Sequence, residues 1–74
     1  MWGRYSEEAR NRLAERVLGK RRELGWTQAV LSQRTGIAVS HICHIEHGAA
    51  NPSIELLVML ASTLGTTVGA LVHE

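Results

Sequence analysis

The sequence predicts a small all-α domain of five helices. Three observations carry this prediction: apolar residues recur at helical spacing, a glycine follows each of the first four apolar segments, and no stretch alternates like a β-strand. The chain of 74 residues, 45% of them apolar, can bury one simple core. We therefore expect residues 1–74 to form a single domain, with residues 1–6 as a flexible N-terminal tail.

The first helix is expected over residues 7–24. Ser6 precedes Glu7 and Glu8, so it can cap the helix while the two acids favour the positive end of the helix dipole. Gly25 then ends the helix as a left-handed cap. Three arginines of this helix are expected to be solvated and paired along it with glutamates: Arg10, Arg12 and Arg16.

Two short helices follow, joined by a tight turn. Thr27 can cap a second helix over residues 28–34, which Gly36 ends, and a third helix over residues 39–47 is ended by Gly48. A glycine at this spacing is typical of the helix-turn-helix unit, because its positive φ lets the two helices cross sharply. The second helix of such a unit enters the major groove of DNA.

Two further helices complete the prediction. Asn51-Pro52-Ser53 forms a turn and a cap before a leucine-rich helix over residues 54–64, which Gly65 ends. Thr67 then caps a short helix over residues 68–72. The inward residues of these two helices recur at helical spacing and are expected in the core: Leu57, Leu60, Ala61, Leu64, Val68 and Leu71.

The third helix is expected to present a small polar face to solvent. At about 100° per residue, Ile42 and Ile45 set the inward direction, and Ala38 points the same way. The residues that then point outward are Ser40, Cys43, His44 and His47. Such a face suits contact with the edges of DNA bases, and it suits an ordinary hydrated helix equally well.

Charge is distributed unevenly, although the formal net charge is only +1. All eight basic residues precede residue 35, and this asymmetry indicates an anionic partner. One cysteine excludes an internal disulfide and favours a reducing compartment. The sequence has no signal-peptide core and no apolar stretch of the roughly 20 residues that cross a bilayer. We therefore expect a cytoplasmic protein without a membrane partner.

Short motifs along the whole chain agree in register with one pattern. They include Gly25-Trp26-Thr27-Gln28, Leu31-Ser32, Gly36-Ile37, Ile45-Glu46, Asn51-Pro52-Ser53 and Leu60-Ala61. Through them, residues from about 13 to 72 resemble the Cro/repressor-type (XRE-type) helix-turn-helix family. The resemblance implies a compact repressor-like DNA-binding domain of five helices, with the helix-turn-helix at helices two and three. It also implies a homodimeric transcriptional regulator that binds a near-palindromic operator.

The same resemblance implies the site residues. Val39, Ser40 and His44 match the base-reading positions of the family. Arg21 and Glu46 match an ion pair that clamps the first helix to the end of the third. Thr27 and Gln28 match positions where the second helix approaches a phosphate, which the free N–H groups of a helix start attract. The expected contacts with the DNA backbone are Thr27, Gln28, Arg34, Cys43 and His47.

Two departures from the family pattern remove charge or capping from the expected DNA face. Ala38 stands where a serine or threonine commonly caps the reading helix. Ala49 and Ala50 replace loop residues that are often basic. These departures keep open a second function, that of a protein-interaction or autoregulatory antitoxin-like module with weak DNA binding. Phage-type repressors, restriction–modification controllers and antitoxin-type autoregulators all fit the sequence.

Apolar residues on the last two helices predict a homodimer. Leu56 and Met59 sit where the family commonly carries polar side chains, and Val58 adds to the apolar surface. A monomer of this size is not expected to expose so much apolar surface. The predicted dimer interface consists of Leu56, Met59, Val68 and Val72.

The histidines of the third helix raise two alternatives. His44 and His47 could share a metal ion, but zinc requires about four ligands, and the nearest carboxylate, Glu46, is expected to pair with Arg21. Cys43 and His47 could form a thiolate–imidazole pair, but catalysis also needs a cleft, an orienting group and oxyanion donors. We expect no enzyme, no metal, no cofactor and no small-molecule ligand.

Overall fold

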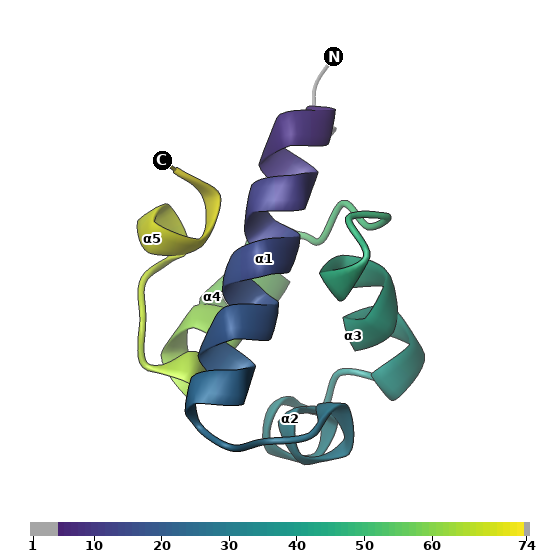
Figure 1. The fold of residues 1–74 in the computed structure, drawn as a ribbon, viewed down its shortest axis with the longest axis vertical. Coiled ribbons are helices and arrows are strands. Elements are labelled where there is room, and N and C mark those ends of the chain that lie inside the picture. The colour runs from purple at the N-terminus through teal and green to yellow at the C-terminus, as the bar shows by residue number, and fades with distance from the viewer. Residues whose placement is uncertain (1–4, 74) are drawn as a thin grey trace.

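Five helices follow one another in the predicted order in the computed structural model, which describes residues 5–73 (Figure 1). They are α1 (Glu7–Glu23), α2 (Gln28–Thr35), α3 (Val39–Glu46), α4 (Ile54–Leu64) and α5 (Val68–Val72). No strand occurs within residues 5–73, and the prediction of an all-α fold is confirmed. The first three helices differ from their predicted ranges by one residue each, at the C-terminal end.

Polar side chains cap four of these five helices. Each of these side chains accepts a hydrogen bond from the backbone N–H three residues further on, and the four residues are Ser6, Thr27, Ser53 and Thr67. The N-cap of α3 is Ala38, which makes no such bond. The prediction that Ala38 points inward is wrong, because Ala38 is exposed. Its ψ of 143° lies outside the helical region, so the angle of about 100° per residue does not apply to it.

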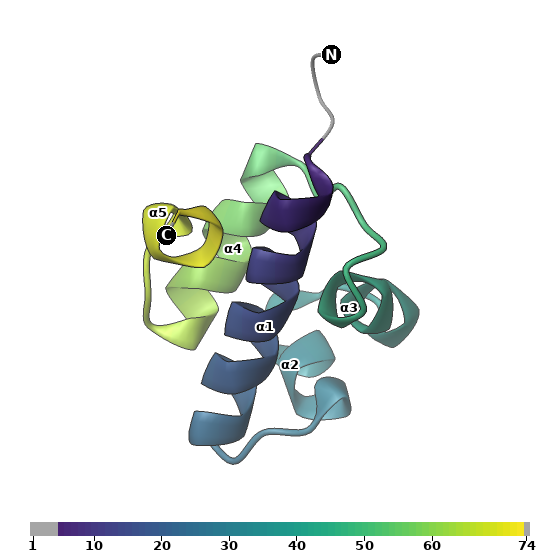
Figure 2. The same cartoon turned by 45° about the horizontal axis from the view of Figure 1, so that its top comes forward.

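α1 lies at the centre of the fold, with α3 on one side and α4 and α5 on the other (Figures 1 and 2). Its buried residues Leu13 and Val17 belong to one core that includes buried residues of the four other helices. The fully buried large residues are Leu13, Val17, Leu31, Ile42, Ile45, Leu60 and Leu71. Each such residue contributes about 1.5–3 kcal/mol relative to an exposed position.

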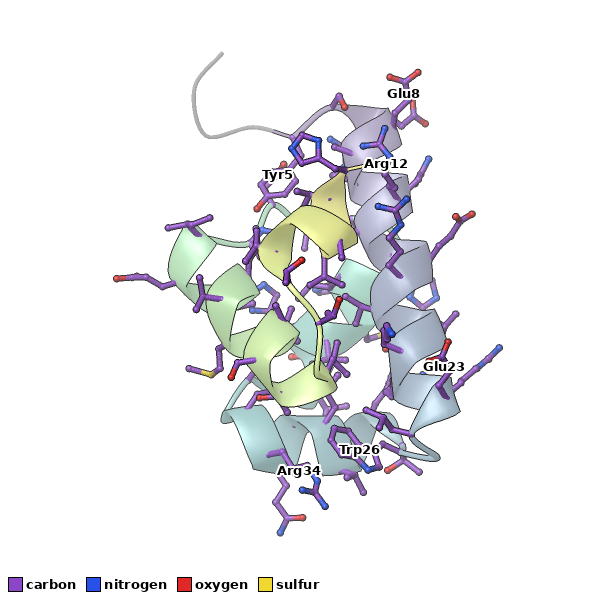
Figure 3. All side chains as sticks on the ribbon, turned by 90° about the vertical axis from the view of Figure 1, so that its left-hand side faces the viewer. Tyr5, Glu8, Arg12, Glu23, Trp26 and Arg34 are labelled. Atoms are coloured by element: carbon purple, nitrogen blue, oxygen red, sulfur yellow. The ribbon has the colours of Figure 1, made fainter. Side chains whose placement is uncertain are left out.

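Two arginines of α1 fasten α5, which corrects the prediction that they are solvated. Arg12 Nη1 donates to the carbonyl of Val72 at 2.7 Å (Figure 3). Arg16 Nη1 donates to the carbonyl of Ala70 at 3.0 Å. The last carbonyls of a helix have no partner within it, and guanidinium groups satisfy them here. A helix of only five residues is thereby held against α1.

Tyr5 and Ser6, which were predicted to belong to a flexible tail, are held by hydrogen bonds. The backbone N–H of Tyr5 donates to Asn51 Oδ1 at 2.9 Å, and its hydroxyl donates to the carbonyl of Pro52 (Figure 3). Ser6 caps α1. Residues 1–4 of the predicted tail lie outside the described residues.

None of the helices in residues 5–73 combines the length and the apolar character that a membrane span requires.

Candidate nucleic-acid interface

The turn between α2 and α3 is held by one buried threonine. Thr35 Oγ1 donates to the carbonyl of Leu31 at 2.7 Å and accepts from the backbone N–H of Ile37 at 3.1 Å. Gly36 between them has a φ of 78°, a conformation that side chains disfavour. The sequence analysis identified Gly36 but missed Thr35, whose position at the end of a helix before a glycine is the signal.

α3 lies at the edge of the molecule (Figure 1), and the side chains on its outward face are mostly polar and exposed. Ile42 and Ile45 anchor the opposite face, since both are almost fully buried. The three predicted base-reading residues are all exposed: Val39, Ser40 and His44. They therefore lie where a duplex could meet them.

Cys43 and His47 contact one another along the same helix. His47 Nδ1 lies 2.7 Å from the carbonyl oxygen of Cys43 and 3.5 Å from its Sγ. Because a carbonyl only accepts, Nδ1 carries the proton and Nε2 is the nitrogen left for an outside partner. Within the described residues, no three histidine, cysteine, aspartate or glutamate side chains are grouped to hold a metal.

A buried ion pair clamps α1 to the end of α3. Arg21 Nε and Nη2 donate to Glu46 Oε2 and Oε1 at 2.7 and 2.9 Å, and the two side chains are only 12% and 3% exposed. Arg21 Nη1 also donates to the carbonyl of Trp26 at 2.9 Å. Burial of Glu46 opposes its ionisation, but the bonds from Arg21 and Gln28 outweigh burial and lower the pKa of this carboxyl.

The two residues expected to contact a phosphate at the start of α2, Thr27 and Gln28, have surroundings that differ from one another. Thr27 is exposed at the helix start, as the resemblance implies. Gln28 Nε2 instead donates to Glu46 Oε1 at 2.9 Å, so its amide belongs to the ion-pair network, a role that the sequence analysis did not predict.

Arg34 stacks on an aromatic ring rather than lying free. Its guanidinium carbon is 4.4 Å from the centroid of the Trp26 ring (Figure 3). Arg34 is exposed near the end of α2, about 120° around the helix from Gln28.

The loop after α3 packs closely against the first turns of α1. Arg10 Nε donates to the carbonyl of Gly48 at 3.0 Å, and its Nη1 donates to the carbonyl of Tyr5 at 2.9 Å. Gly48 has a φ of 73°, and a Cβ on it would lie 2.6 Å from Asn11 Oδ1. These contacts also correct the prediction that Arg10 is solvated.

The predicted dimer residues fall on two flanks of α4. Leu56 and Met59 border a groove against the α2–α3 turn. Val68 and Val72 border another hollow with Ile54. The exposed large apolar residues of α4 are Ile54, Val58 and Met59, at 64%, 53% and 45%. The sequence analysis missed Ile54, which opens the helix and so gave no periodic signal.

Comparisons with known proteins agree with this geometry. A family model described as helix-turn-helix matches residues 18–71. The chain is 39% identical over 57 residues to the HTH-type transcriptional regulator DdrOP3 of Deinococcus deserti, which covers 77% of this chain and 44% of that protein. It is 32% identical over 62 residues to the immunity repressor protein of Bacillus phage phi105, covering 84% of this chain and 43% of the repressor.

Two more proteins complete the comparison. The HTH-type transcriptional regulator SinR of Bacillus licheniformis is 30% identical over 63 residues, which cover 84% of this chain and 57% of SinR. The chain thus spans about half the length of the curated relatives it matches. A hypothetical transcription factor from Neisseria, NHTF, shares the fold with a TM-score of 0.83 and 23% identity, over 92% of this chain and 79% of that one.

Proposed function

The chain belongs to the helix-turn-helix family, and we propose that it is a DNA-binding transcriptional regulator that acts as a homodimer on a near-palindromic operator. The observation that carries the proposal is α3, which is anchored by Ile42 and Ile45 and turns an exposed face of small polar residues outward. The three curated relatives, named as regulators and a repressor, support the same function. We propose a cytoplasmic location, since a regulator that binds DNA acts where the DNA lies.

In this proposal α3 lies in the major groove of DNA, which is about 12 Å wide. Val39 touches a thymine methyl group, while Ser40 and His44 form hydrogen bonds with base edges. Backbone N–H groups at the start of α2, together with Thr27, bind a phosphate. Cys43 and His47 face the backbone of the duplex on the same side of α3.

Homodimerisation accounts for the apolar surface of α4 and α5. Two copies related by a two-fold axis would place their reading helices about 34 Å apart, in successive major grooves. We propose that Leu56, Met59, Val68 and Val72 contribute to the contact, together with the exposed residues Ile54 and Val58. The proposed partners are therefore double-stranded DNA and a second copy of the chain.

The test is a selection of duplexes from a random library by the purified protein, followed by binding of the selected site. We expect enrichment of a sequence with dyad symmetry and an affinity that falls steeply with salt concentration. Ser40→Ala should weaken binding about tenfold and relax the preference at one base pair of each half-site. A folded protein that enriches no sequence would contradict the proposal and favour the protein-interaction module, which the uncharged Ala49-Ala50 segment would suit.

A further inference from the structure

The first described residues of the chain converge on a single loop. Tyr5 donates to Asn51 and Pro52, and Arg10 joins the carbonyl of Gly48 to that of Tyr5. We call Tyr5 and Arg10 the N-terminal clasp. Both residues precede the segment 18–71 that the family model matches. Figure 2 shows the start of α1 beside the segment that leads from α3 to α4.

The clasped loop, residues 48–52, directly follows the proposed reading helix and carries no charged side chain. The start of the loop is held by a hydrogen bond from the N–H of Ala49 to the carbonyl of His44, at 2.9 Å. The N–H groups of Ala50 and Asn51 donate to no group within the described residues. A loop at the end of a helix in the major groove meets the rim of that groove, where the phosphates lie.

We propose that the N-terminal clasp positions this loop to bind a DNA phosphate through the N–H groups of Ala50 and Asn51. The inference rests on the proposed function. Backbone donors bind an anion well only when their geometry is set in advance, because ordering a loose loop on binding opposes association. The clasp supplies that order and so replaces the basic side chains that the loop lacks.

Arg10 acts through the loop and not as a phosphate ligand itself. Its Nε and Nη1 are both directed to carbonyls of the chain, at 3.0 and 2.9 Å. The Tyr5 hydroxyl carries no charge and donates to the carbonyl of Pro52. Tyr5 and Arg10 are therefore positioning residues. Their effects on DNA binding should be alike although only one of them is charged.

Two conservative variants test the clasp. Tyr5→Phe removes one hydroxyl. Arg10→Lys keeps the charge, but the lysine ammonium lacks the planar guanidinium group that donates to the carbonyls of both Gly48 and Tyr5. We expect both variants to remain folded, and the hydrogen-bonded amide protons of Gly48 and Ala49 to exchange about tenfold faster in the free protein. Affinity for the duplex selected by the wild type should fall about tenfold, and the salt dependence should decrease by about one phosphate contact.

Arg16→Lys is the matched control. It alters an arginine of the same helix that also donates to a backbone carbonyl, that of Ala70 in α5. We expect its affinity and the exchange of its loop amides to equal those of the wild type. An equal loss of affinity in Arg16→Lys would overturn the inference, because the effect would then not depend on the loop.

Three other results would also overturn the inference, and each leads to a different conclusion. If Tyr5→Phe speeds loop exchange but binds DNA like the wild type, the clasp is purely structural and the proposed function stands. If Arg10→Lys binds normally while Arg10→Gln does not, Arg10 contacts phosphate directly. If the folded wild type binds no duplex, the proposed function fails together with the inference.

Discussion

Glu46→Gln is expected to lower the free energy of unfolding by about 3–5 kcal/mol, because it leaves a buried arginine without its counter-charge. The Glu46 side chain is 3% exposed and accepts from both Arg21 and Gln28. Small domains have only about 5–15 kcal/mol of stability in total. The midpoint of thermal unfolding, measured by circular dichroism, should therefore fall by on the order of 20 °C.

The double variant Arg21→Met with Glu46→Met is the control for this result. It removes both charges together, so no unpaired charge stays buried, and part of the lost stability should return. If the single variants Arg21→Met and Glu46→Met both melt like the wild type but fail to bind DNA, a structural role of the pair is contradicted. The pair would then be part of the DNA contact.

The pair also predicts the response of stability to acid. The folded-state pKa of Glu46 lies below its usual value of 4.5, so the unfolded chain takes up the proton first as the pH falls. The stabilisation is fully present above pH 4.5 and is lost as the pH falls through the folded-state pKa. Urea unfolding between pH 6 and pH 3 should therefore show a smaller loss of stability in the double variant than in the wild type.

Val58→Glu and Met59→Glu are expected to give folded monomers whose affinity for the selected operator is at least about 100-fold lower. A dimer holds its second reading helix at a high effective concentration near the second half-site, and a monomer loses this advantage. The two residues are neighbours on α4 and point about 100° apart, so each variant tests a different part of the proposed contact. Sedimentation of the two variants shows whether both parts belong to the interface.

Leu24→Glu is the matched control, because Leu24 is 44% exposed, close to the 45% of Met59, and lies at the end of α1. It should sediment and bind DNA as the wild type does. A wild-type protein that is monomeric at high micromolar concentration would contradict the dimer. So would two charged variants that both remain dimeric.

The sequence predicts the helices of this domain well because their ends depend on neighbouring residues. Ser6, Thr27, Ser53 and Thr67 each cap with a side chain that reaches only three residues along the chain. Helical periodicity gave the wrong orientation for Ala38, because this residue precedes the first turn of α3 and is not in the helical conformation.

Contacts between distant residues were far less predictable. Arg10 bonds to a carbonyl 38 residues away, and Arg12 to one 60 residues away. No spacing rule connects such positions, so the expectation of solvated arginines followed from their charge and from the glutamates along the same helix. The pairing of Arg21 with Glu46 was implied by the family resemblance, whereas the bond from Gln28 to the same carboxylate was implied by neither source.

The central place of α1 determines when the domain can fold during synthesis. α1 leaves the ribosome first, yet it packs against α3, α4 and α5, and its arginines bond to carbonyls of the last helix. Until α5 emerges, Leu13 and Val17 lack part of the core that covers them. Once it has emerged, a small helical chain completes its contacts within milliseconds. A nascent chain stopped before residue 68 would therefore be a target for proteases.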